Sequence, residues 1–292
     1  MKYRIKHITE YLYSDRVTHC YNLAHVIPRD TLRQKCTNNR ISVNPISAAV
    51  SKREDYFGNI AYHFEIQRSH KTMIITASSE VVTSPQHAAL DMDFGLTCRE
   101  ARQLLASDHS YETLMAREFM LDSPMIKVFP GIIEYAAPLF EDDRPLLSAV
   151  NELTRKIFRD FEYSPEATSI ATPLVDVFQQ RKGVCQDFAH LQIACLRGLG
   201  FPAKYVSGYL ETLPPPGQEK LVGADASHAW LSVFSPTEGW FEFDPTNDCV
   251  AGEQHIITSW GRDFSDVTPL RGVIFGGGDD SNLSVSVDVA RI

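Results

Sequence analysis

The pattern of apolar residues changes at Ser84–Pro85, and this change constrains the fold more than any other feature of the sequence. Before it, apolar and polar residues alternate, as in residues 62–67, which is typical of half-buried strands. After it, apolar residues recur at helical spacing, as in residues 146–161. We therefore expect an α+β chain in which residues 1–85 form an N-terminal antiparallel β domain resembling a sandwich, and residues 86–292 form the second domain.

The second part of the chain is expected to mix helices and strands. Helices are predicted over 97–106, 111–120 and 146–161, over a segment that Thr172 caps and Pro173 opens, and from Cys185 to Leu199. Strands are predicted over 203–211, 228–234, 240–244 and 283–289, with Gly276-Gly277-Gly278 as a flexible connection before the last one. Residues 57–59 are a predicted turn, and residues 212–226 a long surface loop of the kind that often carries function.

The composition excludes several classes of protein. The 292 residues carry a formal net charge of −9 with no basic stripe, so nucleic acid and anionic membrane surfaces are not expected partners. No run of apolar residues is long enough to span a bilayer, and the first residues do not predict a signal peptide. The six cysteines are scattered without close pairs, which indicates reduced thiols in a cytoplasmic protein. The oligomeric state stays open.

Cys185 is the strongest candidate for chemistry. It follows Gly183 at the predicted start of a helix, where the first backbone N–H groups are unpaired and the helix dipole is positive. Both features favour a thiolate, the form that attacks a carbonyl carbon. The alternative is a small buried apolar residue, which is the expected role of Cys195 ten residues later.

His228 and Asp244 lie on two strands joined by a short loop, and together they complete a possible triad. The hairpin pairs residue 234 with 240 or residue 233 with 239, and either register places both side chains on one face. They would then be direct partners at about 4.5–5.5 Å or diagonal neighbours at about 7–8 Å. Each has a structural alternative, a core histidine and a strand-ending turn, but a Cys-His-Asp set predicts covalent acyl transfer. Trp230 shares their face and either walls the cleft or lies in the core.

A metal or cofactor site is not expected. Cys, His and Asp are all metal ligands, but a structural zinc site needs four such groups, and here each stands alone without a nearby fourth. The group around His19, Cys20 and His25 is equally weak. The run of glycines at 276–278 does not fit a phosphate-binding loop.

Four motifs give the chain a resemblance to bacterial transglutaminase-like proteins, proposed cysteine proteases of the papain-like superfamily. They are Gly183-Val184-Cys185-Gln186-Asp187-Phe188-Ala189-His190, Ala203-Lys204-Tyr205-Val206-Ser207-Gly208-Tyr209, His228-Ala229-Trp230 and Phe243-Asp244-Pro245-Thr246. The resemblance implies a core in which the helix bearing the cysteine packs on an antiparallel sheet, after an N-terminal β region. It also implies Cys185 as nucleophile, His228 as base and Asp244 as the residue that orients the base.

The expected function is therefore thiol-dependent hydrolysis or transfer of a peptide or protein amide through a thioester. The alternatives are a protein-glutamine transglutaminase with an amine acceptor and a catalytically silent peptide-binding module. Glu211, Glu219 and Asp225 against one Lys220 make the long loop acidic, which could attract a cationic amine, although hydrolysis is preferred. The backbone N–H of Cys185 is one expected oxyanion donor. Tyr163 and Gln180 are candidates for the second.

Overall fold

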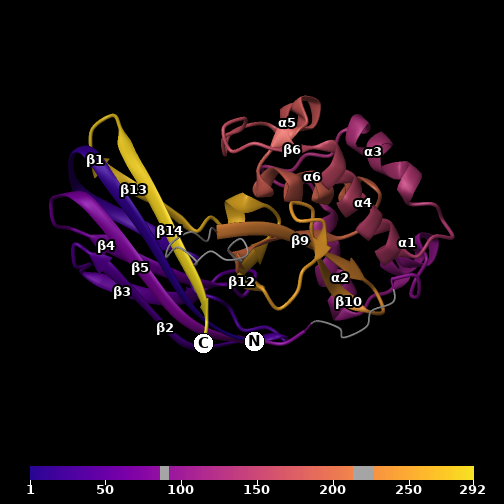
Figure 1. Cartoon of the computed structure of the whole chain (residues 1–292), viewed down its shortest axis with the longest axis horizontal. Helices are drawn as coiled ribbons and strands as arrows, with labels where there is room; N and C mark the ends of the chain where they lie inside the picture. The colour runs from indigo at the N-terminus through magenta and orange to yellow at the C-terminus, as the bar shows by residue number, and fades with distance from the viewer. Residues whose placement is uncertain (86–91, 213–226) are drawn as a thin grey trace, which may run out of the picture.

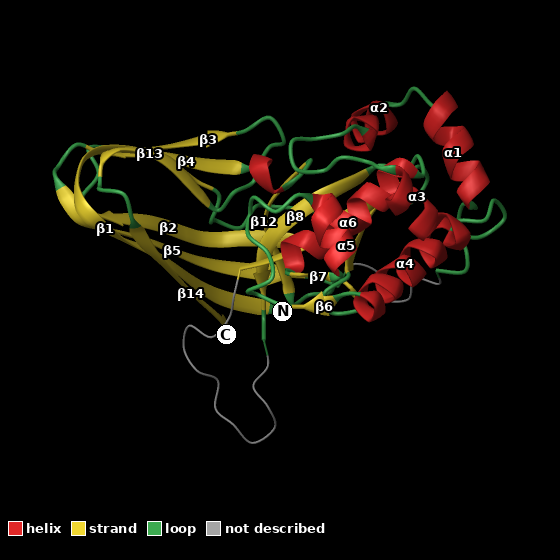
Figure 2. Cartoon of the chain, turned by 90° about the horizontal axis from the view of Figure 1, so that it is seen from above, coloured by secondary structure: helices red, strands yellow, loops and turns green. Residues whose placement is uncertain are grey.

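The chain folds into two β-sheets and a layer of helices, as seen in a computed structural model that describes residues 1–85, 92–212 and 227–292 (Figures 1 and 2). A strongly bent sheet lies on one side of the molecule, and a second sheet with the helices lies on the other. The predicted α+β class is confirmed. No helix among the described residues is long and apolar enough to cross a membrane.

The first sheet is organised by one long strand, β1 (Lys2–Ala24). The first half of β1 pairs with β5 (His70–Thr83) and β14 (Ser281–Arg291), and the second half pairs with β4 (Ile60–Ile66) and β13 (Leu270–Gly276). Strands β2 (Gln34–Asn44) and β3 (Ala49–Glu54) extend the two halves.

The two halves of this sheet face each other across an apolar core. The register with β5 shifts between Leu12 and Val17, so β1 bends there. In Figure 2, strands β3, β4 and β13 consequently form one layer and β2, β5 and β14 the other. Buried side chains from both layers, including Tyr13, Phe64 and Met73, fill the space between them. The sandwich-like character predicted for residues 1–85 therefore arises from a single folded sheet.

The C-terminal strands correct the predicted extent of the second domain. Strands β13 and β14 pair with β1, so residues 270–291 belong to the first sheet and not to a unit spanning 86–292. Sequence alone gave no sign of this pairing, because it joins residues as distant as Tyr3 and Arg291. The predicted hinge at Gly276, Gly277 and Gly278 is the turn between these strands, in which all three have positive φ.

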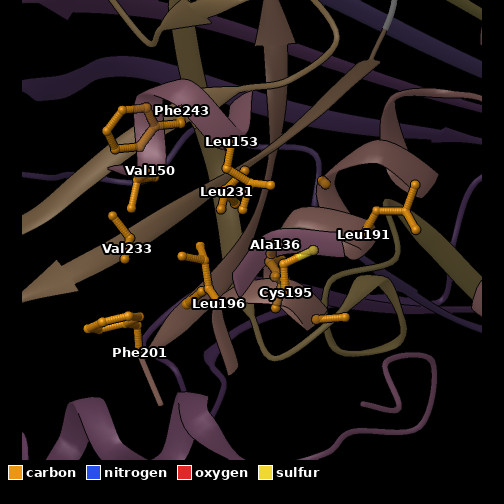
Figure 3. Close-up of a cluster of buried hydrophobic side chains, with 14 of the residues drawn as sticks. Ala136, Val150, Leu153, Leu191, Cys195, Leu196, Phe201, Leu231, Val233 and Phe243 are labelled. Atoms are coloured by element: carbon orange, nitrogen blue, oxygen red, sulfur yellow. The ribbon is translucent and has the colours of Figure 1, made fainter. Parts of the chain in front are cut away.

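The second sheet has the order β11-β10-β9-β8-β12 and is antiparallel throughout. Its strands are β8 (Ala203–Leu210), β9 (Ser227–Ser235), β10 (Gly239–Asp244), β11 (Cys249–Val250) and β12 (His255–Gly261). One face packs against the helices, where Leu196 of the central helix lies near Leu231 and Val233 of β9 (Figure 3). Leu231 and Val233 therefore form part of the apolar core beneath the helices.

The helices lie on that one face of the second sheet. They are α1 (Cys98–Ser107), α2 (Tyr111–Arg117), η1 (Glu118–Met120), α3 (Pro130–Ala136), η2 (Ala137–Leu139), α4 (Leu146–Asp160), α5 (Leu174–Gln180), α6 (Cys185–Gly198) and, beyond β12, η3 (Phe264–Asp266). A short parallel pair, β6 (Glu162–Tyr163) and β7 (Lys182–Gly183), lies next to the start of α6. Helix α5 begins at Leu174 with Pro173 as its N-cap, so the prediction that Thr172 caps it is wrong by one residue.

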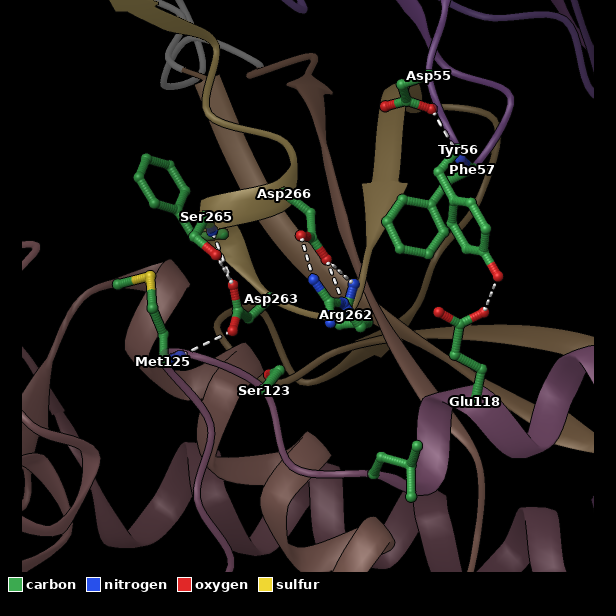
Figure 4. A network of polar contacts seen from close by, with 12 residues as sticks. Asp55, Tyr56, Phe57, Glu118, Ser123, Met125, Arg262, Asp263, Ser265 and Asp266 are labelled. Atoms are coloured by element: carbon green, nitrogen blue, oxygen red, sulfur yellow. Dashed lines mark hydrogen bonds and ion pairs between the residues drawn. The ribbon is translucent and has the colours of Figure 1, made fainter.

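Polar contacts join the first sheet to the helical part of the chain (Figure 4). The hydroxyl of Tyr56, in the turn between β3 and β4, donates to Glu118 of η1 at 3.1 Å, and the ring of Phe57 lies 5.8 Å from that of Phe119. The Asp263 carboxylate accepts the backbone N–H of Met125 at 2.8 Å, which ties the segment before α3 to the end of β12. The first two contacts link the first sheet to η1, and the third links the helical segment to the second sheet.

Strands of the second sheet and Arg29 together form a stack of cations and indole rings. Trp260 lies between the guanidinium of Arg29, 3.2 Å from the ring centroid, and the ammonium of Lys204, 3.9 Å away. Lys204 also lies 4.1 Å from the ring of Trp240. Burial lowers the pKa of Lys204 to about 7, against the opposing effect of nearby Glu242. The stack therefore holds a buried amine between the two halves of the protein.

Candidate active site

The start of α6 is fixed by a side chain from its own first turn. The Asp187 carboxylate accepts the N–H of Val184 at 2.9 Å and the hydroxyl of Thr168 at 2.7 Å. Asp187 packs so closely on Gly183 that a Cβ there would lie 2.8 Å from it, which explains the glycine. Cys185 is thus held as the first helical residue, with its side chain half-buried, as the sequence predicted.

His228 and Asp244 meet across the hairpin of β9 and β10. Trp240 pairs with Phe234 and Phe243 with Leu231, which makes the two residues diagonal neighbours on one face. The distance from His228 Nε2 to Asp244 Oδ2 is 2.7 Å, a short hydrogen bond. The prediction that they share a face is therefore confirmed, in the diagonal register.

Cys185 reaches this pair through the imidazole. Burial by itself would lower the pKa of His228, but hydrogen bonds to Asp244 and Cys185 and the charges of both residues raise it to about 10. Because Nε2 faces Asp244, Nδ1 is the ring nitrogen left for the sulfur. The structure therefore brings the three predicted site residues together, with the imidazole between thiol and carboxylate.

Asp244 is fully buried, and both oxygens of its carboxylate accept hydrogen bonds. Oδ1 accepts the backbone N–H groups of Thr246 at 2.9 Å and Asn247 at 3.3 Å. Oδ2 accepts the side-chain amide of Asn247 at 2.7 Å and lies 3.1 Å from Nε2 of His255. Although burial raises the pKa of Asp244, the hydrogen bonds from His228 and His255 and the charge of His228 lower it overall. The carboxylate is therefore ionised at neutral pH.

Sequence reasoning missed His255 and Asn247. Asn247 had a weak signal, because an Asp-Pro turn brings the following residues back onto the aspartate. His255 had none, since it begins β12, which pairs with β8, a strand about fifty residues earlier. Only the tertiary structure shows that it contacts Asp244.

His228, Asp244 and His255 form a cluster of a size that could hold a metal ion. Two ligands of a tetrahedral zinc ion, each about 2.0–2.1 Å from it, lie about 3.3 Å apart. Asp244 Oδ2 lies only 2.7 and 3.1 Å from the two imidazole nitrogens, which are hydrogen-bond distances. The cluster as folded therefore fits a proton-bonded network and would have to open to bind zinc.

Three further expectations are corrected or lie outside the described residues. Trp230 is not a cleft wall: it is fully buried under the His228 ring, and its indole N–H donates to Glu242 at 2.7 Å. Glu211 is not free to attract an amine, because it is buried and pairs with Arg291 at 2.7 Å. The other charged residues of the predicted loop, at 219, 220 and 225, lie outside the described residues.

The two candidates for a second oxyanion donor differ in their surroundings. Tyr163 pairs through its backbone with Gly183, and its side chain is 54% exposed. Burial and, after it, the charge of Cys185 raise the pKa of Tyr163, so the phenol lies within electrostatic reach of the thiol. Gln180 ends α5 with an exposed side chain. Of the two, Tyr163 is the one whose side chain is affected by the charge of Cys185.

Comparison with known proteins bears on both parts of the chain. Residues 3–82 match the bacterial transglutaminase-like N-terminal region, and residues 133–245 match the transglutaminase-like superfamily. An uncharacterised protein of Mycobacterium tuberculosis is 42% identical over 294 residues, covering 99% of this chain and 92% of that protein. The protein-glutamine gamma-glutamyltransferase of Pseudomonas aeruginosa is 31% identical over 119 residues, covering 38% of this chain and 18% of that enzyme.

A solved structure shows the same fold. The crystal structure of a protein from Cytophaga hutchinsonii, described as a proposed cysteine protease, superposes with a TM-score of 0.75 at 21% sequence identity. The superposition covers 99% of this chain and 90% of that one. These findings confirm the predicted resemblance and the predicted fold class.

Proposed function

Because the chain belongs to the transglutaminase-like superfamily, we propose that it is a thiol-dependent amide hydrolase or acyltransferase acting on peptides or proteins. The observation that carries the proposal is the position of the His228 imidazole, which bonds Asp244 through Nε2 and contacts Cys185. A thiol, a base and a buried ionised carboxylate in this order are the parts of covalent acyl transfer.

The first step is attack of the Cys185 thiolate on the amide carbon. The raised pKa of His228, about 10, favours an imidazolium beside the sulfur at neutral pH. The carbonyl π electrons move to oxygen as the S–C bond forms, and backbone N–H groups in the first turn of α6 can stabilise the oxyanion. Tyr163 is proposed as a second donor to it, because the charge of Cys185 acts on its phenol.

The second step expels the amine. The oxyanion collapses, the C–N bond breaks, and His228 gives its Nδ1 proton to the leaving nitrogen, which leaves a thioester on Cys185. Water or a second amine then attacks the thioester while His228 takes the proton of the attacking group. The tetrahedral intermediate collapses, the S–C bond breaks, and the acid or new amide leaves with Cys185 restored as the thiolate beside the imidazolium. Asp244 holds the imidazole in the tautomer that keeps its proton on Nε2.

Water or an amine could accept the acyl group from Cys185. We favour water, with an amine as the alternative. Of the acidic residues that could attract an amine, only Glu211, just before the predicted loop, is described, and it is already paired with Arg291. A silent peptide-binding module is the other alternative. It would not need a buried carboxylate holding a histidine against a thiol.

The test supplies glutamine-containing donor peptides with and without excess primary amine, and follows both products by mass spectrometry. We expect release of ammonia or of a cleaved peptide, with hydrolysis exceeding amine incorporation. Cys185→Ala should abolish both, and Cys195→Ala serves as a matched control because that thiol is buried away from the triad. Predominant amine incorporation would replace hydrolysis by transglutamination. No covalent adduct at reduced Cys185 with any acyl donor would favour the silent module.

The cytoplasmic location stays a prediction. It rests on the six cysteines, all of which are free in the structure. Fractionation of the host cell with an antibody to the protein tests it directly.

A further inference from the structure

We propose that His255 is a positioning residue that acts on the triad through Asp244, an inference that rests on the function proposed above. His255 is the first residue of β12, an edge strand of the second sheet. Strands β8 and β9 separate it from β10, which carries Asp244. The side chain of His255 is only 5% exposed, and its Nε2 lies 3.1 Å from Asp244 Oδ2. It therefore approaches the carboxylate from an element that the triad does not otherwise use.

The protonation state of His255 follows from its other nitrogen. Nδ1 lies 3.2 Å from the backbone nitrogen of Gly252, whose N–H donates to it. A ring nitrogen that accepts a hydrogen bond carries no proton, so His255 is neutral with its proton on Nε2. It must then donate that proton to Asp244 Oδ2.

The hydrogen bond from His255 affects both the charge of Asp244 and its orientation toward His228. Oδ2 receives hydrogen bonds from His228, His255 and the amide of Asn247, while Oδ1 receives two backbone N–H groups. A fully buried carboxylate stays ionised only when its oxygens are satisfied in this way. His255 thus helps to keep Asp244 charged and fixes the direction in which Oδ2 faces the imidazole of His228.

Packing holds His255 in this role. Its ring contacts Trp230 edge-on with centroids 5.2 Å apart, and Trp230 stacks under His228 at 5.9 Å. The charged groups near this cluster are Asp244 and His228 themselves, Glu242, which accepts the indole N–H of Trp230, and Arg33. Arg33 forms an ion pair with Glu242 and donates to the carbonyl of Gly252 at 3.3 Å. One buried indole therefore supports both imidazoles that bond Asp244.

Two substitutions separate a hydrogen-bonding role from simple packing. His255→Leu keeps an apolar side chain but removes the donor, whereas His255→Gln places an N–H donor close to the position of Nε2. His70→Leu is the matched control, because His70 is another buried histidine, with Nδ1 2.8 Å from a carbonyl oxygen of its own turn in the first sheet.

The measurement is the rate of Cys185 alkylation by iodoacetamide between pH 5 and pH 10, mapped by mass spectrometry on folded protein, together with turnover where a substrate is found. Alkylation needs no substrate, so it tests His255 even if the proposed reaction fails. We expect His255→Leu to slow alkylation at pH 6 about tenfold, by analogy with the lower end of the effect of losing an outer hydrogen-bond partner of a metal ligand. His255→Gln should recover most of that rate, and His70→Leu should match the wild type.

Three outcomes would overturn the proposal. One is an unchanged alkylation profile in His255→Leu; another is an equal loss in His255→Gln, which would point to ring packing; the third is an equal loss in His70→Leu. If His255→Leu does not fold, His255→Asn replaces it, because its shorter amide can meet the Gly252 N–H but not Asp244. Equal profiles for the asparagine and glutamine variants would then contradict the role.

Discussion

Replacing Asp244 by asparagine should damage both the stability of the protein and the chemistry of Cys185. The amide oxygen must take the place of Oδ1, because that position accepts the backbone N–H groups of Thr246 and Asn247. The new NH2 group then takes the place of Oδ2. There it faces the proton of His255 Nε2 and the amide protons of Asn247, so donor meets donor.

The magnitude follows from these two conflicts. Each buried donor left unsatisfied costs about 1–3 kcal/mol, so the free energy of unfolding should fall by about 2–6 kcal/mol. His228 can bond the new amide only by accepting through Nε2, which moves its proton to Nδ1 and removes its ability to take a proton from Cys185. In serine triads the equivalent change lowers turnover by about 10⁴, and we expect a loss approaching that size.

The difference in stability should depend on pH. Asp244 has a lowered pKa in the folded protein, so its stabilising contribution is present above the unfolded value of about 3.9 and is lost as the pH falls. His228 has a pKa raised to about 10, so its contribution is full below the unfolded value of about 6.5 and disappears as the pH rises through 10. Wild type and Asp244→Asn should therefore differ most between about pH 4 and pH 6.5.

Urea denaturation across this pH range, with Cys185 alkylation on the folded variants, measures these effects. Asp248→Asn is the matched control, because it removes the same charge from an exposed position four residues away. Unfolding free energies and alkylation rates of Asp244→Asn that equal those of the control would refute the reasoning, and with it the role of Asp244.

One comparison of alkylation rates and two substitutions test neighbouring features. Cys185 should be alkylated faster at pH 7 than any other cysteine, since burial raises the pKa of Cys98 to about 11 and of Cys249 to about 12; equal rates by peptide mapping would contradict this. Gly208→Ala should lower the unfolding free energy by at least about 1–3 kcal/mol, because its Cβ would overlap the carbonyl of Ile256 and lie 2.6 Å from Trp230, whereas Gly252→Ala meets no atom and serves as control. The unfolding free energy should rise between pH 7 and about pH 10.4, because in this range only the unfolded chain keeps the Lys204 amine protonated. Lys204→Met should remove this rise, and a rise that persists in the variant would show that Lys204 is not its source.

Much of the site could be predicted from local sequence. A glycine, a cysteine and an aspartate within one turn define the start of α6, and a short hairpin loop fixes which residues of β9 and β10 share a face. The apolar stripe of the long helix and the alternation in the first strands are likewise local, and the corresponding elements were predicted correctly. Local patterns succeed here because neighbouring residues largely decide these conformations.

What sequence reasoning missed depends on distant pairing. His255 contacts Asp244 only because β12 joins β8 at the edge of the sheet. Trp230 was left undecided between cleft and core, and its burial depends on Gly208 of the neighbouring strand, which leaves room for the indole. Strands β13 and β14 were placed in the wrong unit for the same reason. None of these relations has a signal within a window of ten or twenty residues.

The return of the last strands to β1 has a consequence for how the protein forms in the cell. Tyr3 pairs with Arg291 and Leu23 with Arg271, so the helices and the second sheet are an insertion between strands of the first. When synthesis has reached the end of α6, the elements that pack on this helix have all been made except the strands that follow it. Strand β1 then still lacks two of its neighbours, β13 and β14. The inserted unit can begin to fold during synthesis, but the sheet that frames it closes only after residues 270–291 have been made, and such distant pairing is intrinsically slow.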